Sequence, residues 1–344
     1  MEKILLLAHL DESGSALPRA AREALAAALE LSSALAAPLT VGLIGENVEA
    51  AANSMVGCGA KILATTGAEL SQPRYATDSA AIEAICRKAE PTLVLAPATS
   101  RFARVMGGAA QLLGGHIDTH ITALAAADGA PRATRWFYRQ RVEAVLTRTA
   151  RPWFLLLDPG TRAQWDGPVC TASVENVTVT LPPTRTQVTC IRAPKQDEQT
   201  IRPDAKLLFV AGAGWTKKQA DGQVHVADAE QLILGFLKGS GASLGSSKSL
   251  VDQTGEGQTA LPFMSHLNQV GQTGATPRHP KGLSTCCHGE EPHVVGWRFI
   301  GERRAVNLDA NCGWARGKAD VLYVADAFQV VKAVNELLAT RGKP

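Results

Sequence analysis

The chain has 344 residues, which is long enough for two domains of ordinary size and a large buried interior. Apolar residues make up 45 % and charged residues 19 %, a balance that excludes a disordered chain or a highly charged coiled coil. Because 35 basic residues face 32 acidic ones and no block of five basic residues occurs, the net charge of +3 gives no support for a nucleic-acid or membrane-surface partner.

The amino terminus and the cysteines indicate the compartment. No apolar run approaches the roughly 18–20 residues that span a bilayer, and Met1 to Lys3 lead directly into an apolar run that predicts a strand. We therefore expect no membrane span and a cytoplasmic location. The seven cysteines have no Cys-x-x-Cys spacing, which favours reduced thiols over a disulfide framework or a zinc ribbon.

The first half of the chain alternates short apolar runs with longer alanine-rich segments of helical period, which is typical of a parallel sheet covered by helices. The expected strands are 3–8, 38–43, 61–64 and 92–96. The expected helices are 17–35, 46–56, 76–89 and 101–113. From 117 to about 180 the pattern changes to shorter Thr- and Val-rich alternation, including Trp153 to Leu157, which favours antiparallel strands added to the same domain.

Three groups of residues in the chain could be read either as functional or as structural. Arg101 and Arg104, which begin the helix 101–113, are interpreted as solvated surface residues rather than partner contacts. An aromatic run with flanking arginines is interpreted as a core strand with solvated charges, the alternative being a docking stripe for nucleic acid or a subunit; it comprises Arg135, Trp136, Phe137, Tyr138, Arg139 and Arg141. Six histidines without shared spacing are interpreted as surface or core residues, namely His9, His116, His120, His225, His266 and His279.

The second half begins after a proline-rich stretch of mixed charge at 186–204, which indicates an exposed linker. We expect one domain over 1–185 and a second α/β domain over 205–344, although Val188 to Ile191 could form an edge strand. The second domain is expected to contain strands at 207–210, 304–308 and 321–324 and helices at 226–237 and 326–339. Between these elements, residues 239–292 show little apolar periodicity, which usually marks a set of loops wrapped around a ligand.

Small residues and hydroxyls in this region suit phosphate or a flat heterocycle, although such turns also occur in ordinary solvent loops. They lie at Gly245 to Lys248 and at Gly271 to Gly274. The turn Gly212-Ala213-Gly214 is not a dinucleotide fingerprint, because Lys217 stands at the third glycine position, so a standard nicotinamide site is not expected there. No Gly-x-Ser-x-Gly, His-Glu-x-x-His or phosphate-loop pattern supports a hydrolase or a kinase.

These turns occur in the order of a known family. Val270 to Gly274, together with Gly245 to Lys248 and Ala319-Asp320, resembles the α subunit of the electron transfer flavoproteins. Further matching segments are Val251-Asp252, Val324 to Val331, Leu6 to His9, Leu95 to Thr99, Ala109 to Leu113 and Asp118-Thr119, so that the resemblance covers nearly the whole chain. The Gly-Gln-Thr-Gly turn is its most specific element.

The resemblance implies an α/β protein of two domains, each built on a largely parallel sheet flanked by helices. The second domain is expected to be a doubly wound domain that binds FAD, and the first to pack with a β-type subunit. Such a protein relays electrons from a partner dehydrogenase to a downstream acceptor such as a quinone reductase. We therefore expect an electron carrier and not an enzyme that transforms a substrate.

The resemblance also implies cofactor-binding residues. Lys248 stands where the family has an arginine beside the isoalloxazine, Thr273 where it has a hydroxyl near flavin N5, and His293 where it has a histidine near the C2 carbonyl. A cation and an imidazole there would stabilise negative charge on the reduced flavin and raise its potential. The remaining implied positions are Gly212, Ser247, Gln272, Gly274, His288, Gly289, Asn307 and Asp320, the last two at the adenosine end.

The chain departs from the family at three places. Lys248 in place of an arginine keeps the positive charge but loses the planar guanidinium group. Ala213 replaces an arginine, and in the loop Cys286 to His293 only Gly289 and His293 survive while two glutamates enter. A pyrophosphate would meet less positive charge, which predicts a shifted flavin potential, a changed pose or loss of the cofactor. One alternative is therefore a scaffold subunit of a dehydrogenase complex that has lost FAD or carries another redox centre. A second is a stand-alone adenine-nucleotide-binding protein, because the alternating pattern of the first domain also suits that role. The candidate ligands for a metal or iron–sulfur centre are Cys286, Cys287, His288, His293 and Cys312.

Overall fold

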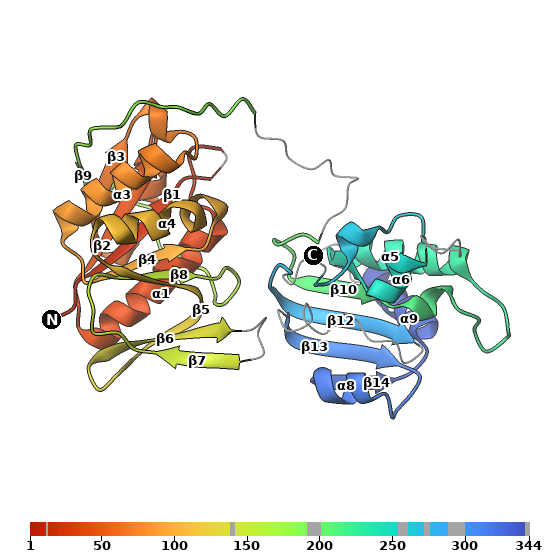
Figure 1. The fold of residues 1–344 in the computed structure, drawn as a ribbon. Helices are drawn as coiled ribbons and strands as arrows, with labels where there is room; N and C mark the ends of the chain where they lie inside the picture. The colour runs from red at the N-terminus through yellow and green to blue at the C-terminus, as the bar shows by residue number, and fades with distance from the viewer. Residues whose placement is uncertain are drawn as a thin grey trace. The chain divides into compact units, whose positions relative to one another are not determined.

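A computed structural model gives the fold and describes residues 1–11, 13–137, 142–190, 201–253, 261–271, 276–287 and 300–340. The chain divides into two compact units, Met1–Ile191 and Arg192–Pro344, and the division falls within the segment 186–204. Each unit is built on its own sheet (Figure 1). No helix in the described part of the chain is both long and apolar enough to cross a membrane.

Unit 1 contains a nine-stranded sheet. Its strands are β1 (Ile4–His9), β2 (Leu39–Gly45), β3 (Lys61–Thr66), β4 (Leu93–Pro97), β5 (His116–Ala127), β6 (Ala130–Phe137), β7 (Val142–Leu146), β8 (Trp153–Leu157) and β9 (Val174–Asn176). They lie in the order β7-β6-β5-β8-β4-β1-β2-β3-β9, and the strands from β5 to β9 in this order are parallel to their neighbours. β6 pairs in the antiparallel sense with both of its neighbours, β5 and β7.

Helices cover both faces of the central strands. They are α1 (Arg19–Leu35), α2 (Glu49–Asn53), α3 (Tyr75–Ala89) and α4 (Ser100–Leu112), with short turns η1 (Val56–Cys58) and η2 (Ala68–Leu70). The small buried residues Ala21 and Ala28 let α1 approach one face of the sheet closely, whereas α3 and α4 pack on the opposite face. Because both faces are covered, β1, β4 and β8 are buried along their whole length.

The pairing of Trp153 to Leu157 corrects the sequence-based expectation. This strand, β8, was expected to be antiparallel, but it lies parallel to β4 and β5 and between them. Five consecutive buried apolar residues are typical of a strand covered on both faces, which the alternation of the neighbouring strands obscured. The short edge strand β9 was not predicted, and residues 188–190 have no regular structure.

Arg101 is buried, although the sequence predicts a solvated surface residue. Its side chain is 7 % exposed, and its Nε and Nη2 donate to the two carboxylate oxygens of Asp78 at 3.0 and 2.6 Å. Nη2 also donates to the carbonyl oxygen of Leu70 at 2.8 Å. The interpretation as a solvated residue is wrong for Arg101, because α3 and α4 share one face of the sheet and bring a carboxylate to the start of α4. It holds for Arg104, which is exposed.

Unit 2 contains a five-stranded, fully parallel sheet. Its strands are β10 (Leu207–Ala211), β11 (Ser243–Ser246), β12 (His279–Cys287), β13 (Ile300–Asn307) and β14 (Val321–Val324). Its helices are α5 (Val226–Ser240), α6 (Lys248–Asp252), α8 (Gly313–Lys318) and α9 (Ala327–Thr340), with turns η3 (Ala213–Thr216) and η4 (His266–Asn268). Residues of α5 and α9 join the core on one face and residues of α8 join it on the other, so the unit is doubly wound. The expected fold class is confirmed.

The region 239–292 is more regular than its sequence predicts, because it contains β11, α6 and the central strand β12. The sequence did not predict β12, because polar side chains occupy its buried positions. Thr285, for example, is fully buried, donates to the carbonyl oxygen of Val210 at 3.0 Å and accepts from Nε1 of Trp215 at 2.8 Å. A strand whose polar groups are satisfied by its neighbours carries no apolar periodicity for a pattern to detect.

Candidate functional site at the carboxyl edge of unit 2

The five strands of unit 2 lie in the order β11-β10-β12-β13-β14. The chain therefore leaves β10 toward β11 on one side and crosses back to β12 on the other side. In doubly wound sheets, ligands bind in the crevice outside the carboxyl ends of the strands at the point where the order reverses, which here lies between β10 and β12. Gly212 follows β10, Ser247 follows β11 and Asn307 ends β13, so three predicted cofactor residues lie along this edge.

Ser247 and Lys248 form the turn from β11 into α6. Ser247 is buried and its hydroxyl accepts from the backbone N–H of Leu250 at 3.2 Å, which makes it the N-cap of α6. Lys248 is 60 % exposed, and its ammonium forms an ion pair with Asp252 one turn later at 2.5 Å. The edge thus carries a cation in contact with solvent, held beside the carboxyl end of β11.

Two buried polar atoms at this edge find no hydrogen-bond partner among the described residues: the hydroxyl of Ser246 and Nδ2 of Asn307. Asn307 is fully buried, and its Oδ1 accepts from the backbone N–H of Asp309 at 3.1 Å, so only the amide's donor half is unsatisfied. Buried donors are almost always paired. An orphaned donor and an orphaned hydroxyl at the carboxyl edge fit the hydroxyl and phosphate oxygens of a dinucleotide.

The flanks of the Gly-Gln-Thr-Gly turn also reach this edge. The backbone N–H of Val270 donates to the carbonyl oxygen of Ser246 at 3.0 Å, which places residue 270 beside the end of β11. Gly271 has a φ of +79°, a left-handed conformation that favours glycine, and its N–H donates to the hydroxyl of Thr276 at 2.7 Å. Both sides of the turn are therefore fixed, while Gln272, Thr273 and Gly274 lie outside the described residues.

The turn after β10 is anchored to β12. The backbone N–H of Gly212 donates to the carbonyl oxygen of Thr285 at 3.2 Å, and the fully buried Trp215 donates to the hydroxyl of the same residue. Ala213, which stands in place of the family's arginine, is fully buried and brings no charge to the edge. Trp215 was not singled out from the sequence, although a tryptophan directly after a glycine turn could have suggested an anchor.

Asp320 does not join the other predicted residues. It precedes β14 and lies beside Arg303 in the first half of β13, whereas Asn307 is the last residue of that strand. Hydrogen bonds from the guanidinium and the backbone N–H of Arg303, together with its charge, lower the pKa of the Asp320 carboxyl. Asp320 therefore ties β14 to β13 near the amino edge of the sheet, and the structure does not bring it to the carboxyl edge.

The loop after β12 begins at the same edge, because Cys287 is paired with Asn307. His288, Gly289 and His293 lie outside the described residues, and so do the side chains of Cys286 and Cys287. Cys312 is a buried free thiol that precedes α8. No group of three potential metal ligands occurs in the described part of the chain, and a centre on the cysteine loop stays a hypothesis.

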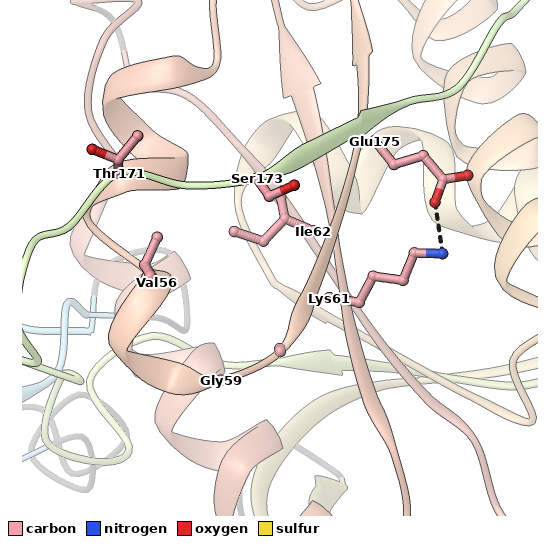
Figure 2. Close-up of a pocket in the computed structure, with 8 residues that line it drawn as sticks. Val56, Gly59, Lys61, Ile62, Thr171, Ser173 and Glu175 are labelled. Carbon is pink, nitrogen blue, oxygen red and sulfur yellow. Dashed lines mark ion pairs between the residues drawn. The ribbon is translucent and has the colours of Figure 1, made fainter.

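A separate surface hollow of about 620 Å³ lies in unit 1, between η1, β3 and the segment around β9 (Figure 2). Glu175 on its rim forms ion pairs with Lys61 at 2.6 Å and with Lys88 at 2.8 Å. Hydrogen bonds from these two ammonium groups lower the pKa of Glu175 to about 2. The lining includes none of the predicted cofactor residues, and its charged groups satisfy one another, so we assign it no ligand.

The arrangement defines a class of protein: an α/β protein whose doubly wound unit has the topology of nucleotide- and flavin-binding domains. The model of the electron transfer flavoprotein domain matches residues 7–182. The chain therefore belongs to the electron transfer flavoprotein family. No curated protein matches the chain.

Proposed function

We propose that the chain is the α-type subunit of an electron transfer flavoprotein, which holds FAD at the carboxyl edge of unit 2 and packs unit 1 against a β-type subunit. Electrons would pass from a partner dehydrogenase to a downstream acceptor such as a quinone reductase. The observation that carries the proposal is that two buried groups, Ser246 Oγ and Asn307 Nδ2, find no hydrogen-bond partner among the described residues and end the strands that flank β10 and β12. Membership of the family supports it.

In this proposal FAD supplies the redox chemistry when it is bound, and the chain supplies position and charge. The orphaned Asn307 amide would donate to a cofactor oxygen, and Gly271 with its positive φ would allow the backbone to approach closely. Lys248 would place a positive charge near the ring, reduced in effect by its ion pair with Asp252. Thr273 and His293 keep their roles as predictions from the resemblance.

The substitution Lys248→Ala is expected to lower the midpoint potential of the bound flavin. Two unit charges about 4 Å apart interact by about 1 kcal/mol when water screens them, which suits an exposed lysine already paired with Asp252, and this energy corresponds to roughly 40 mV for a one-electron step. A spectroelectrochemical titration of the assembled protein measures the shift. Lys238→Ala is the matched control, because Lys238 is an exposed lysine at the end of α5, by the amino edge of the sheet. Equal midpoint potentials in the two variants would show that Lys248 does not lie near the flavin ring.

The substitution Asn307→Leu is expected to weaken FAD binding by about tenfold or more, since one hydrogen bond to a buried cofactor contributes about 1.5 kcal/mol. It also removes the acceptor for Asp309, so the flavin-free protein should lose about 1 kcal/mol. Fluorescence titration of flavin-free protein with FAD measures the first effect, and thermal unfolding without FAD measures the second. Unchanged FAD affinity beside reduced stability would show that Asn307 has only a structural role.

The proposed function is tested on the chain purified together with a co-expressed β-type subunit. The ultraviolet–visible spectrum of the pair should show flavin bands that bleach on reduction. An intact assembly without flavin bands would favour the scaffold subunit. A monomer that binds an adenine nucleotide tightly and no β-type subunit would favour the nucleotide-binding protein.

A further inference from the structure

The buried histidine His279 begins β12 at the amino edge of the unit 2 sheet, and both nitrogens of its ring face carbonyl oxygens. The residue is 2 % exposed. Nδ1 lies 2.7 Å from the carbonyl oxygen of Pro277, and Nε2 lies 2.8 Å from the carbonyl oxygen of Arg202. Pro277 is two residues before His279 in the chain, whereas Arg202 is 77 residues away, in the segment that leads into β10.

Two carbonyl acceptors determine the charge of this ring. A neutral imidazole has one N–H donor and one bare nitrogen that only accepts, whereas the imidazolium cation donates from both nitrogens. A neutral ring would therefore leave a bare nitrogen facing a carbonyl oxygen, and a buried pair of acceptors is unfavourable. The distances of 2.7 and 2.8 Å are those of charge-assisted hydrogen bonds. The geometry requires a doubly protonated His279.

Residues 201–205, which we call the entry segment, are docked on unit 2 by further contacts. Ile201 is 8 % exposed and joins the core on the α8 side of the sheet. The backbone N–H of Arg202 donates to the hydroxyl of Ser243 at 2.8 Å, and its guanidinium donates to the turn that follows α5. An arginine stays charged at every ordinary pH, so these contacts do not titrate, whereas the contact with His279 does.

The charged groups around the ring are mostly basic. On the entry segment, beside it and on the neighbouring parts of β12 and β13, they are Arg202, Asp204, Lys206, Arg278, Lys281, Glu302 and Arg303. Both carboxylates of this set lie within 4.0 Å of a cation of the same set. Ile300, which pairs with His279 on β13, is apolar. Since surplus positive charge disfavours another cation, the two carbonyl contacts are the described interactions that hold the proton on the ring.

We propose that His279 is a pH-sensitive switch that docks the entry segment on unit 2. The charged ring donates to both carbonyl oxygens. When Nε2 releases its proton to solvent, Nδ1 keeps its contact with Pro277, which the short chain between them holds nearby. The bare Nε2 then faces the carbonyl oxygen of Arg202, the entry segment loosens, and the chain between the two units gains the length of this segment. The inference goes beyond the proposed function and does not depend on FAD.

The direction of the pH effect follows from linkage between protonation and docking. The docked state holds a proton that the loosened state releases, so docking is complete at low pH and is lost as the pH rises through the titration of the docked ring. Because one proton is released, the equilibrium constant for loosening can rise by at most about tenfold for each pH unit.

The charge of the ring is tested by nitrogen NMR of the full chain containing isotope-labelled histidine, over a range of pH. We expect both ring nitrogens of His279 to carry protons at about pH 7.5, where a free histidine is mostly neutral. The signal is assigned by its loss in His279→Gln. A ring with one protonated and one bare nitrogen at every pH at which the chain is folded would overturn the inference.

The docking is tested by amide hydrogen exchange of the entry segment, corrected for the intrinsic effect of pH on exchange. In the wild-type chain, protection should fall by up to about tenfold for each pH unit as the ring of His279 loses its proton, while β10 stays protected. This measurement needs no variant. In H279Q, protection should be lower and independent of pH. His266→Gln is the matched control, because His266 is 54 % exposed in the same unit, and it should behave as wild type. Wild-type protection that does not change through the titration of the ring would contradict the switch.

Discussion

Replacing Arg101 by alanine should lower the free energy of unfolding of unit 1 by about 3–5 kcal/mol, the usual cost of removing one partner of a buried ion pair. Arg101 and Asp78 are both buried, and the variant leaves the carboxylate of Asp78 without its two guanidinium hydrogen bonds. The carbonyl oxygen of Leu70 loses a donor as well. Urea denaturation followed by circular dichroism measures the change.

Arg104→Ala is the control for this experiment, because Arg104 belongs to the same turn of α4 but is exposed, and its removal should change stability by less than about 0.5 kcal/mol. The double variant Arg101→Ala with Asp78→Ala should recover part of the loss, since it leaves no unpaired buried charge. Equal stabilities of R101A and R104A would mean that the buried pair does not hold α3 and α4 together.

Asp118→Asn should destabilise unit 1 by about 2–3 kcal/mol at neutral pH, because hydrogen bonds to a charged group are stronger than neutral ones. The buried Asp118 accepts from Nε of Arg148 at 2.5 Å and from Nε1 of Trp153 at 2.9 Å, and it lies 3.4 Å from Nη1 of Arg135. One carboxylate thus ties β5, β6 and β8 and the segment after β7. Chemical denaturation at pH 7 measures the loss.

The pH dependence of this effect has a definite sign. Burial alone would raise the pKa of Asp118, but the hydrogen bonds from Arg148 and Trp153 and the charges of the two arginines outweigh it and lower the pKa. A lowered folded-state pKa gives stability that is present above the unfolded-state pKa and is lost as pH falls through the folded-state value. The difference between wild type and D118N should therefore shrink as the pH falls below about 4, the ordinary pKa of an aspartate, and through the lower folded-state pKa. A difference that stayed constant over this range would contradict the assignment.

The elements with strong periodicity were predictable from the sequence. The helices α1, α3 and α4 begin and end within two residues of their expected bounds, since small apolar residues repeat at helical spacing. β12 was not predictable, because the hydroxyl of its buried Thr285 is satisfied by Val210 and Trp215, which are distant in sequence. The burial of Arg101 was hidden for the same reason: its partner Asp78 lies on another helix.

The resemblance to the family, and not the local pattern alone, implied the residues of the candidate site, and their roles stay predictions. Gly212, Ser247 and Asn307 end or follow strands, and the parallel topology brings them to one edge. The hydroxyl of Ser246 finds no partner among the described residues, and this could not be foreseen because the sequence does not show which groups lie around a buried side chain. Asp320 shows the opposite case: the family pattern suggested a cofactor contact, and the structure pairs the residue with Arg303.

The central claim is that unit 2 holds FAD, and the most direct test is the amount of flavin and iron per chain in the protein purified with its β-type subunit. We predict one FAD for each copy of this chain and no iron, released as free FAD on denaturation and lost in part from Asn307→Leu. An assembled pair with no flavin, or with iron bound in place of flavin, would contradict the account.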